Sequence, residues 1–163
     1  MRSRFNLAKA HEIAKAINEK LRPIAEASVD LNDPTWMDRM RQSEPLDEAG
    51  VRPEAESLLR SLIDAYASGS SKQRAEIREL FRKNSSFRWA ATIPQSAETA
   101  EGFRWRLIRL SILTGVEDPR DLILSLKSIL ETAEAAGVAI KPILAEVAAL
   151  SESPLREVLS GRS

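Results

Sequence analysis

The most constraining feature of this sequence is a helix signal that is marked at both ends. Asp118 can accept hydrogen bonds from the first backbone N–H groups of a helix, and Pro119 fits the first turn, where its missing N–H costs nothing. Gly137 tolerates the left-handed conformation in which helices often end. The pattern predicts an amphipathic helix between Asp118 and Gly137. Its apolar stripe comprises Leu122, Ile123, Leu126, Ile129, Leu130 and Ala133.

Weaker forms of this signal recur along the chain and predict an all-α protein. The first expected helix runs from Asn6 to about Arg22, because Pro23 fits poorly inside a helix and should end or kink it. The sequence contains no Asn-Gly or Asp-Gly hairpin turn. The other expected helices cover about 34–42, 53–67, 71–84, 86–91, 97–114, 142–150 and 154–159. Short connections imply a stack of about eight or nine antiparallel helices, either irregular and α-solenoid-like or a helical bundle.

The helix expected over 97–114 differs from the others because it is apolar on two sides. Phe103, Leu107, Leu110 and Thr114 form one stripe, and Trp105, Ile108 and Ile112 form a second on roughly the opposite side. A helix with two apolar sides is covered on both. We therefore expect this helix in the middle of the stack.

The length of 163 residues is most simply one domain over 1–163. It would have an N-terminal helix over 1–24, a looser connection over 25–52, which is rich in turn-forming residues, and packed helix pairs over 53–163. The absence of cysteine excludes disulfides, thiolate zinc sites and cysteine nucleophiles. No apolar run is long enough for a secretory signal or a membrane span, so we expect a soluble, cytoplasmic protein.

The region from about Ser71 to Leu159 resembles the helix pairs of HEAT and armadillo-type solenoids. The best match is the unit from Asp118 to Gly137 followed by Pro142 to Leu150. The resemblance is architectural and identifies no functional residue. It implies binding of a protein or peptide on a concave helical surface, since such solenoids are rarely enzymes.

Basic residues are concentrated in the middle of a chain whose formal net charge is zero. Residues 72–109 contain nine basic and four acidic side chains. Arg74, Arg78 and Arg82 have a spacing that places them on one face of a helix, where like charges repel. Arginine binds carboxylate or phosphate groups through two hydrogen bonds. The candidate partner-binding residues are Arg74, Arg78, Arg82, Arg104, Arg106 and Arg109.

Two explanations of this arginine cluster stay open. Acidic residues of neighbouring helices could neutralise it, or it could bind an anionic partner such as an acidic protein surface or a phosphate backbone. Phe87, Trp89 and Trp105 lie in the same segment. Buried, these rings would belong to the core, which we expect. Exposed, they would be interface anchors or stacking platforms for bases.

The remaining candidates for chemistry have structural interpretations. His11 is the only histidine, so a metal site with two histidines is excluded, and we expect it at the edge of an apolar face. Asp30, Asn32 and Asp33 resemble a cation loop, but Pro34 occupies a ligand position and the required glycine is missing. We therefore predict no metal, no cofactor and no catalytic residue.

The expected function is that of a non-catalytic protein–protein interaction module. A small bacterial immunity or adaptor protein would have this size and composition. The expected partner is another protein with an acidic surface. The alternative is binding of nucleic acid or another polyanion through residues 72–109.

Overall fold

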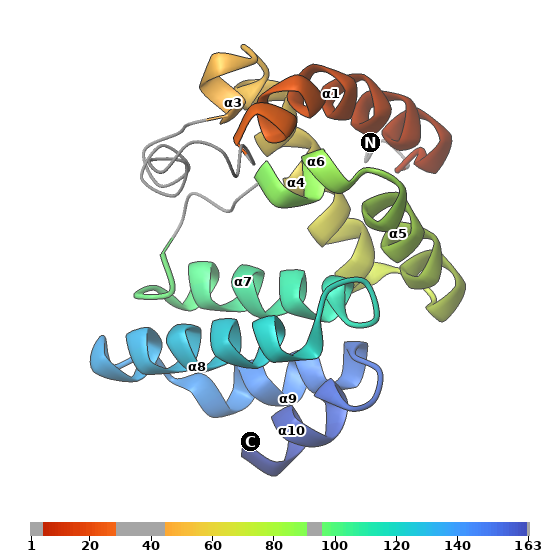
Figure 1. The fold of residues 1–163 in the computed structure, drawn as a ribbon. Coiled ribbons are helices and arrows are strands. Elements are labelled where there is room, and N and C mark those ends of the chain that lie inside the picture. Colours follow the sequence, from red (N-terminus) through yellow and green to blue (C-terminus); the bar gives the residue numbers. More distant parts are fainter. Residues whose placement is uncertain (1–4, 29–44, 91–95, 163) are drawn as a thin grey trace. The chain divides into compact units, whose positions relative to one another are not determined.

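The structure is a computed structural model that describes residues 5–28, 45–90 and 96–162, where all regular elements are helices (Figure 1). The all-α prediction is therefore confirmed for these ranges. The predicted helix over 34–42, with Trp36, Met37 and Met40, and the candidate cation loop lie outside them. The described ranges contain nine helices: α1 (Leu7–Ser28), α3 (Pro45–Glu48), α4 (Arg52–Ser68), α5 (Ser71–Lys83), α6 (Ser85–Ala90), α7 (Ala100–Leu113), α8 (Pro119–Ala135), α9 (Ile140–Leu150) and α10 (Leu155–Arg162).

The chain divides into two compact units. Unit 1 comprises residues 1–62 and 80–92, and unit 2 comprises residues 63–79 and 93–163. The boundaries fall inside α4 and α5, so each of these two helices contributes to both units. The assignment of residues 1–163 to one domain stays a prediction.

In unit 1, α1 packs against α3 and α6. The buried side of α1 comprises Ala10, Ala14, Ile17 and Leu21. Asn18 is also buried, and its Oδ1 accepts a hydrogen bond from the backbone N of Phe87 at 2.9 Å. Because Phe87 lies in the first turn of α6, this bond satisfies an N–H that has no partner within the helix. The Phe87 ring packs against Phe81 with 5.6 Å between centroids.

The predicted end of the first helix near Pro23 is wrong. Helix α1 continues through Pro23 to Ser28. A proline inside a helix leaves the carbonyl four residues earlier without its N–H partner. That carbonyl belongs to Glu19, and Glu19 and Pro23 are both exposed, so water can solvate it.

In unit 2, α7 packs against α8 and α9, and α10 packs against α9 (Figure 1). Nine of the 14 residues of α7 are buried, and they include every member of the two predicted stripes except Thr114, which is half-buried. The two-sided burial of this helix is confirmed. Its predicted start at Ala97 is wrong, because the Thr99 hydroxyl accepts a hydrogen bond from Gly102 N at 3.0 Å and caps a helix that begins at Ala100.

Both predicted ends of α8 are confirmed. Asp118 Oδ1 accepts a hydrogen bond from Arg120 N at 2.8 Å, and Pro119 is the first helical residue. At the other end Gly137 has φ +77°, and Val138 N donates to Ala133 O at 3.0 Å. These are the features of a glycine-terminated helix.

The predicted stripe of α8 is only partly buried. Leu126, Leu130 and Ala133 face the core of unit 2. Ile123 was expected inside with them, but its side chain is 61% exposed, so this expectation is wrong. The position is about 60° around the helix from Leu126, at 100° per residue, and therefore lies outside the narrow strip that α7 and α9 cover.

The cap of α8 yields a direct test. Replacing Asp118 with alanine should lower the free energy of unfolding by about 0.5–2 kcal/mol, because the first N–H groups lose their acceptor. Urea unfolding followed by circular dichroism would measure it. Ser125→Ala, at an exposed position in the same helix, is the control and should leave stability unchanged or slightly higher. Equal stability of Asp118→Ala and the wild type would contradict the capping role.

Candidate functional site

The six candidate arginines lie in different environments, and Arg74 lies in the first turn of α5 and contacts the connection before it. Its guanidinium donates to the backbone oxygen of Gly69 at 2.6 Å and to the Ser71 hydroxyl at 3.3 Å. Both acceptors lie at the connection between α4 and α5. Arg74 therefore holds this connection against the first turns of α5.

Arg78 is buried in unit 2. Its Nη2 donates to the Tyr66 hydroxyl at 2.8 Å, and its guanidinium lies 5.5 Å from the centroid of the same ring. Its Nη1 forms an ion pair with Glu152 at 3.2 Å, 74 residues further along the chain. The side chain of Glu152 is largely exposed, so the charge of Arg78 is neutralised at the edge of the buried region.

The Tyr66 hydroxyl continues this contact into a buried polar cluster. It lies 2.8 Å from the Ser111 hydroxyl on α7 and 3.4 Å from the carbonyl oxygen of Leu150. The Ser151 hydroxyl lies 2.9 Å from Ser111 and also donates to Val147 O at 2.7 Å. The cluster thus ties the end of α4, α5, α7 and the end of α9 together within unit 2.

The polar cluster holds helices together and contains no base that could activate its serines. A serine becomes a nucleophile when a neighbouring base accepts its proton. The groups around Ser111 and Ser151 are hydroxyls and a carbonyl oxygen, and the nearby Arg78 guanidinium can only donate. These contacts orient and satisfy buried hydroxyls, so we assign them a structural role.

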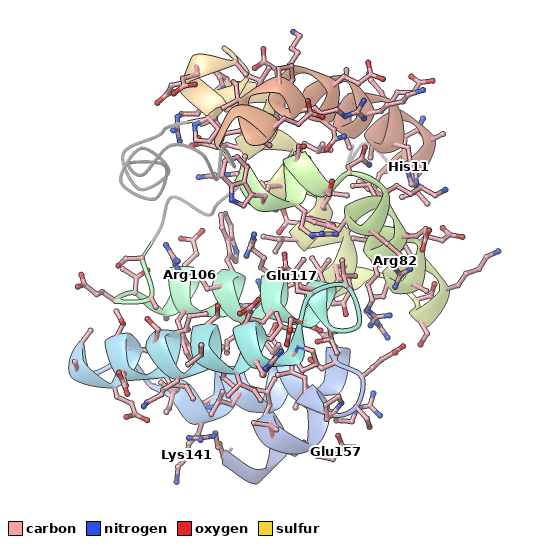
Figure 2. The ribbon with its side chains drawn as sticks, in the orientation of Figure 1. His11, Arg82, Arg106, Glu117, Lys141 and Glu157 are labelled. Atoms are coloured by element: carbon pink, nitrogen blue, oxygen red, sulfur yellow. The ribbon has the colours of Figure 1, made fainter. Side chains whose placement is uncertain are left out.

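The other four candidate arginines are less buried than Arg78. Arg104 on α7 forms an ion pair with Glu146 on α9, with 2.8 Å between Nε and Oε1. Arg106 and Arg109 are half-buried on α7, and Arg82 is exposed on α5. Figure 2 labels Arg82 and Arg106 on these two helices. Each of Arg82, Arg106 and Arg109 also makes interactions within the structure.

Neutralisation by distant acids is therefore observed for two of the six arginines. Glu152 meets Arg78, and Glu146 meets Arg104. Since Arg78 is buried between Arg74 and Arg82, the three do not form a continuous exposed ridge along α5. Binding of a partner by the six arginines stays a prediction.

The aromatic residues of the same segment also differ in exposure. Phe87 and Trp105 are buried and belong to the core, as expected. Trp89 was expected in the core as well, but its side chain is 39% exposed, so that expectation is wrong for this residue. Trp89 lies near the end of the six-residue helix α6, and the buried side of this helix carries Phe87 and Ala90 instead.

Among the described residues, His11 and the acidic side chains are not grouped for metal binding. His11 is half-buried on α1, where Figure 2 labels it. In the ranges that the structure describes, no three His, Cys, Asp or Glu side chains are grouped to hold a metal ion.

The sequence did not indicate an apolar surface on α8. Ile123 and Leu124 are 61% and 66% exposed; Leu124 lies roughly opposite Leu126 on α8, and Ile123 lies beside the covered strip. Arg120 and Lys127 are exposed one turn before and one turn after them. We call these four residues the α8 patch. The spacing of three and four residues between Arg120, Ile123, Leu124 and Lys127 could have revealed the α8 patch. The apolar stripe predicted from the sequence placed Ile123 in the core and did not include Leu124.

A surface hollow with two carboxylates lies near the other end of α8. Its volume is about 570 Å³, and it is lined by Glu98, Glu131, Thr132, Ala135 and Ala136. Small side chains therefore separate a carboxylate near the start of α7 from one on α8. A long cationic side chain could lay its aliphatic stem on the alanines and place its charge near the carboxylates.

One carboxyl group has a perturbed acidity. The Ser153 hydroxyl donates to Glu157 Oε1 at 2.5 Å and lowers the pKa of that carboxyl below its usual value. Glu157 lies in the first turn of α10, where Figure 2 labels it. The contact fixes the start of α10. Because the pKa of Glu157 is lowered, the stabilisation from this contact is lost as the pH falls through the lowered pKa.

Comparisons of the chain with protein-family models, with curated proteins and with solved structures found no match. Within the described ranges, none of the helices combines the length and the apolar character that crossing a bilayer requires. The geometry of the α8 patch, the acidic hollow and the arginines is therefore the basis for the proposals below.

Proposed function

We propose that this protein is a non-catalytic protein-interaction module that binds its partner through the α8 patch. The observation that carries this proposal is the exposure of Ile123 and Leu124, neighbours on a regular, well-capped helix. Burying such a side chain is worth about 1.5–3 kcal/mol, so two of them can supply much of the affinity of a small interface. An apolar centre with a charged rim is typical of binding surfaces.

The charges of the patch indicate the chemistry of the partner. Arg120 and Lys127 flank the two aliphatic side chains and favour a partner with acidic groups around an apolar contact. The resemblance of residues 71–159 to HEAT and armadillo-type helix pairs supports the same interpretation, because those proteins bind partners on helical surfaces. An adaptor or immunity protein would use a surface of this kind.

A photo-crosslinking residue at exposed Ser128, one turn beyond Leu124, would test this proposal. We expect an adduct at this position in extracts of the native host or with purified protein. In the background of Ile123→Ser or Leu124→Ser, the adduct should fall about tenfold, since tenfold in affinity corresponds to about 1.4 kcal/mol. Val158→Ser is the matched control, because Val158 on α10 is also an exposed aliphatic residue, at 40%.

Two outcomes of this experiment would contradict the proposal. Adduct yields that are equal in Leu124→Ser, Val158→Ser and the unsubstituted background would show that the α8 patch binds nothing. Labelled oligonucleotides that bind below about 1 µM with a steep salt dependence, and lose this binding in Arg82→Ala, would favour the polyanion alternative instead.

A further inference from the structure

We propose that the partner of the α8 patch is a second copy of this chain, bound through an antiparallel pair of α8 helices. This inference rests on the proposed function, because it names the occupant of the same surface. It is carried by the order of charges along the exposed side of α8 and by the acidic hollow at the end of that side.

The exposed side of α8 has the spacing of a helix–helix seam. Arg120, Leu124, Lys127 and Glu131 follow one another at intervals of four, three and four residues, and all four are exposed. This alternation places side chains in one line along a helix and is the spacing with which two helices meet. Ile123 lies beside this line. The other side of α8 is covered by α7 and α9 and carries Leu126, Leu130 and Ala133.

When a second copy of this line runs in the opposite direction, the positive charge at one end lies opposite the negative charge at the other end. The line begins with Arg120 and ends with Glu131, and Leu124 and Lys127 lie between them. In an antiparallel pair whose two-fold axis passes between residues 125 and 126, Arg120 of each copy lies opposite Glu131 of the other. Leu124 then lies opposite Lys127, whose aliphatic stem can cover it. Such two-fold, self-complementary contacts are the commonest way in which identical chains associate.

The acidic hollow strengthens this register. Glu131 lines it together with Glu98, and Thr132, Ala135 and Ala136 form the rest of its wall. In the antiparallel pair, Arg120 of the second copy reaches this position. Its present contact does not oppose the move, because the ion pair with Asp118 is long, at 3.4 Å, and the Arg120 side chain is 88% exposed.

The alternative orientation of two α8 helices is unfavourable. In a parallel pair, Arg120 would lie opposite Arg120, Lys127 opposite Lys127 and Glu131 opposite Glu131, and like charges in contact repel. Only one of the four seam positions is apolar. One helix pair also buries less area than the roughly 1,200–2,000 Å² of stable complexes, so we expect weak, salt-sensitive association.

Charge reversal at two positions tests the register. Arg120→Glu places a glutamate opposite Glu131 twice in each pair, and Glu131→Arg places an arginine opposite Arg120 twice. Each variant alone should associate at least about tenfold more weakly than the wild type. An equimolar mixture of the two variants restores opposite charges at both contacts and should regain the wild-type dissociation constant within about threefold. The doubly reversed chain, Arg120→Glu with Glu131→Arg, should regain it as well.

The substitutions are chosen to leave the fold intact. A glutamate at 120 lies in the first turn of α8 and an arginine at 131 lies near its end, so both charges suit the helix dipole. Lys141→Glu is the matched control, because Lys141 is an exposed cation in the first turn of α9, as Figure 2 shows. Circular dichroism would confirm that all variants keep the helical signal and thermal midpoint of the wild type.

Sedimentation equilibrium of purified full-length protein at low and high salt would measure the association. We expect the mass of the wild type and of Lys141→Glu to rise from one chain toward two with concentration, at a dissociation constant of tens to hundreds of micromolar. A wild type that stays at the mass of one chain up to about 1 mM at low salt would overturn the inference. So would single reversals that associate like the wild type, or a mixture that does not recover.

The two proposals can fail separately. A Ser128 adduct with a different protein that depends on Leu124, combined with purified chains that do not associate, would keep the proposed function and overturn the second copy as occupant. Absence of any Leu124-dependent adduct would overturn both.

Discussion

The variants Leu107→Ala and Ile108→Ala should each have a free energy of unfolding about 2–5 kcal/mol lower than the wild type. Both side chains are fully buried, and they belong to opposite apolar sides of α7. Truncation of either removes buried methyl groups and leaves a cavity, because a packed core relaxes only in part. Urea unfolding of the full-length protein, followed by circular dichroism at low protein concentration, would measure the two losses.

Matched controls for this prediction lie on α8. Ile123→Ala and Leu124→Ala remove similar aliphatic groups from exposed positions and should change the free energy of unfolding by about 0.5 kcal/mol or less. A loss for only one of Leu107 and Ile108 would show that α7 is covered on one side. Losses at Ile123 or Leu124 as large as those in α7 would contradict their exposure.

The second large effect is expected at Arg78. Arg78→Ala should cost about 2–4 kcal/mol, because it removes the bond to the Tyr66 hydroxyl, the cation–π contact with that ring, the ion pair with Glu152 and the packing of the side-chain stem. The cost stays below that of a fully buried pair, since Glu152 remains solvated when Arg78 is absent. Arg78→Lys keeps the charge but not the planar fork, so an intermediate loss is expected.

A double-mutant cycle locates the source of this effect. Tyr66→Phe removes the hydroxyl that joins Arg78 to Ser111 and should cost about 1–3 kcal/mol. The double variant Arg78→Ala with Tyr66→Phe should lose less than the sum of the two single losses, by about 1 kcal/mol. Arg82→Ala, one turn further along α5, is the control and should cost about 0.5 kcal/mol or less. Strict additivity, or equal costs at Arg78 and Arg82, would contradict the buried cluster.

The prediction of the individual helices from sequence succeeded where the signals are local. A helix needs acceptors for its first N–H groups and a residue that tolerates positive φ after its end. Asp118 and Gly137 supply these for α8, and both were recognisable without a fold. The two apolar sides of α7 could also be read from the sequence, because the period of a helix assigns each residue to a direction. The continuation of α1 through Pro23 could not, since it depends on solvent around Glu19.

The candidate site was less predictable than the helices. The arginine cluster was recognised, but its explanation requires Glu152 and Glu146, which are 74 and 42 residues away from the arginines they meet. The α8 patch was missed because Ile123 is apolar and lies near the edge of the stripe. Whether an edge position is covered depends on how wide a strip the neighbouring helices cover, and α7 and α9 leave this one open.

The sequence by itself determined the secondary structure class, most helix ends and the two-sided burial of α7, because hydrogen bonding along the backbone and helical periodicity act over a few residues. Only the tertiary structure decided which polar and apolar side chains stay in contact with water. Arg78 is charged and buried, whereas Leu124 is apolar and exposed. Burial depends on which distant surface packs against a residue, and the free energy of that packing is shared among helices far apart in the chain. The surface available to a partner is therefore a property of the packed helices.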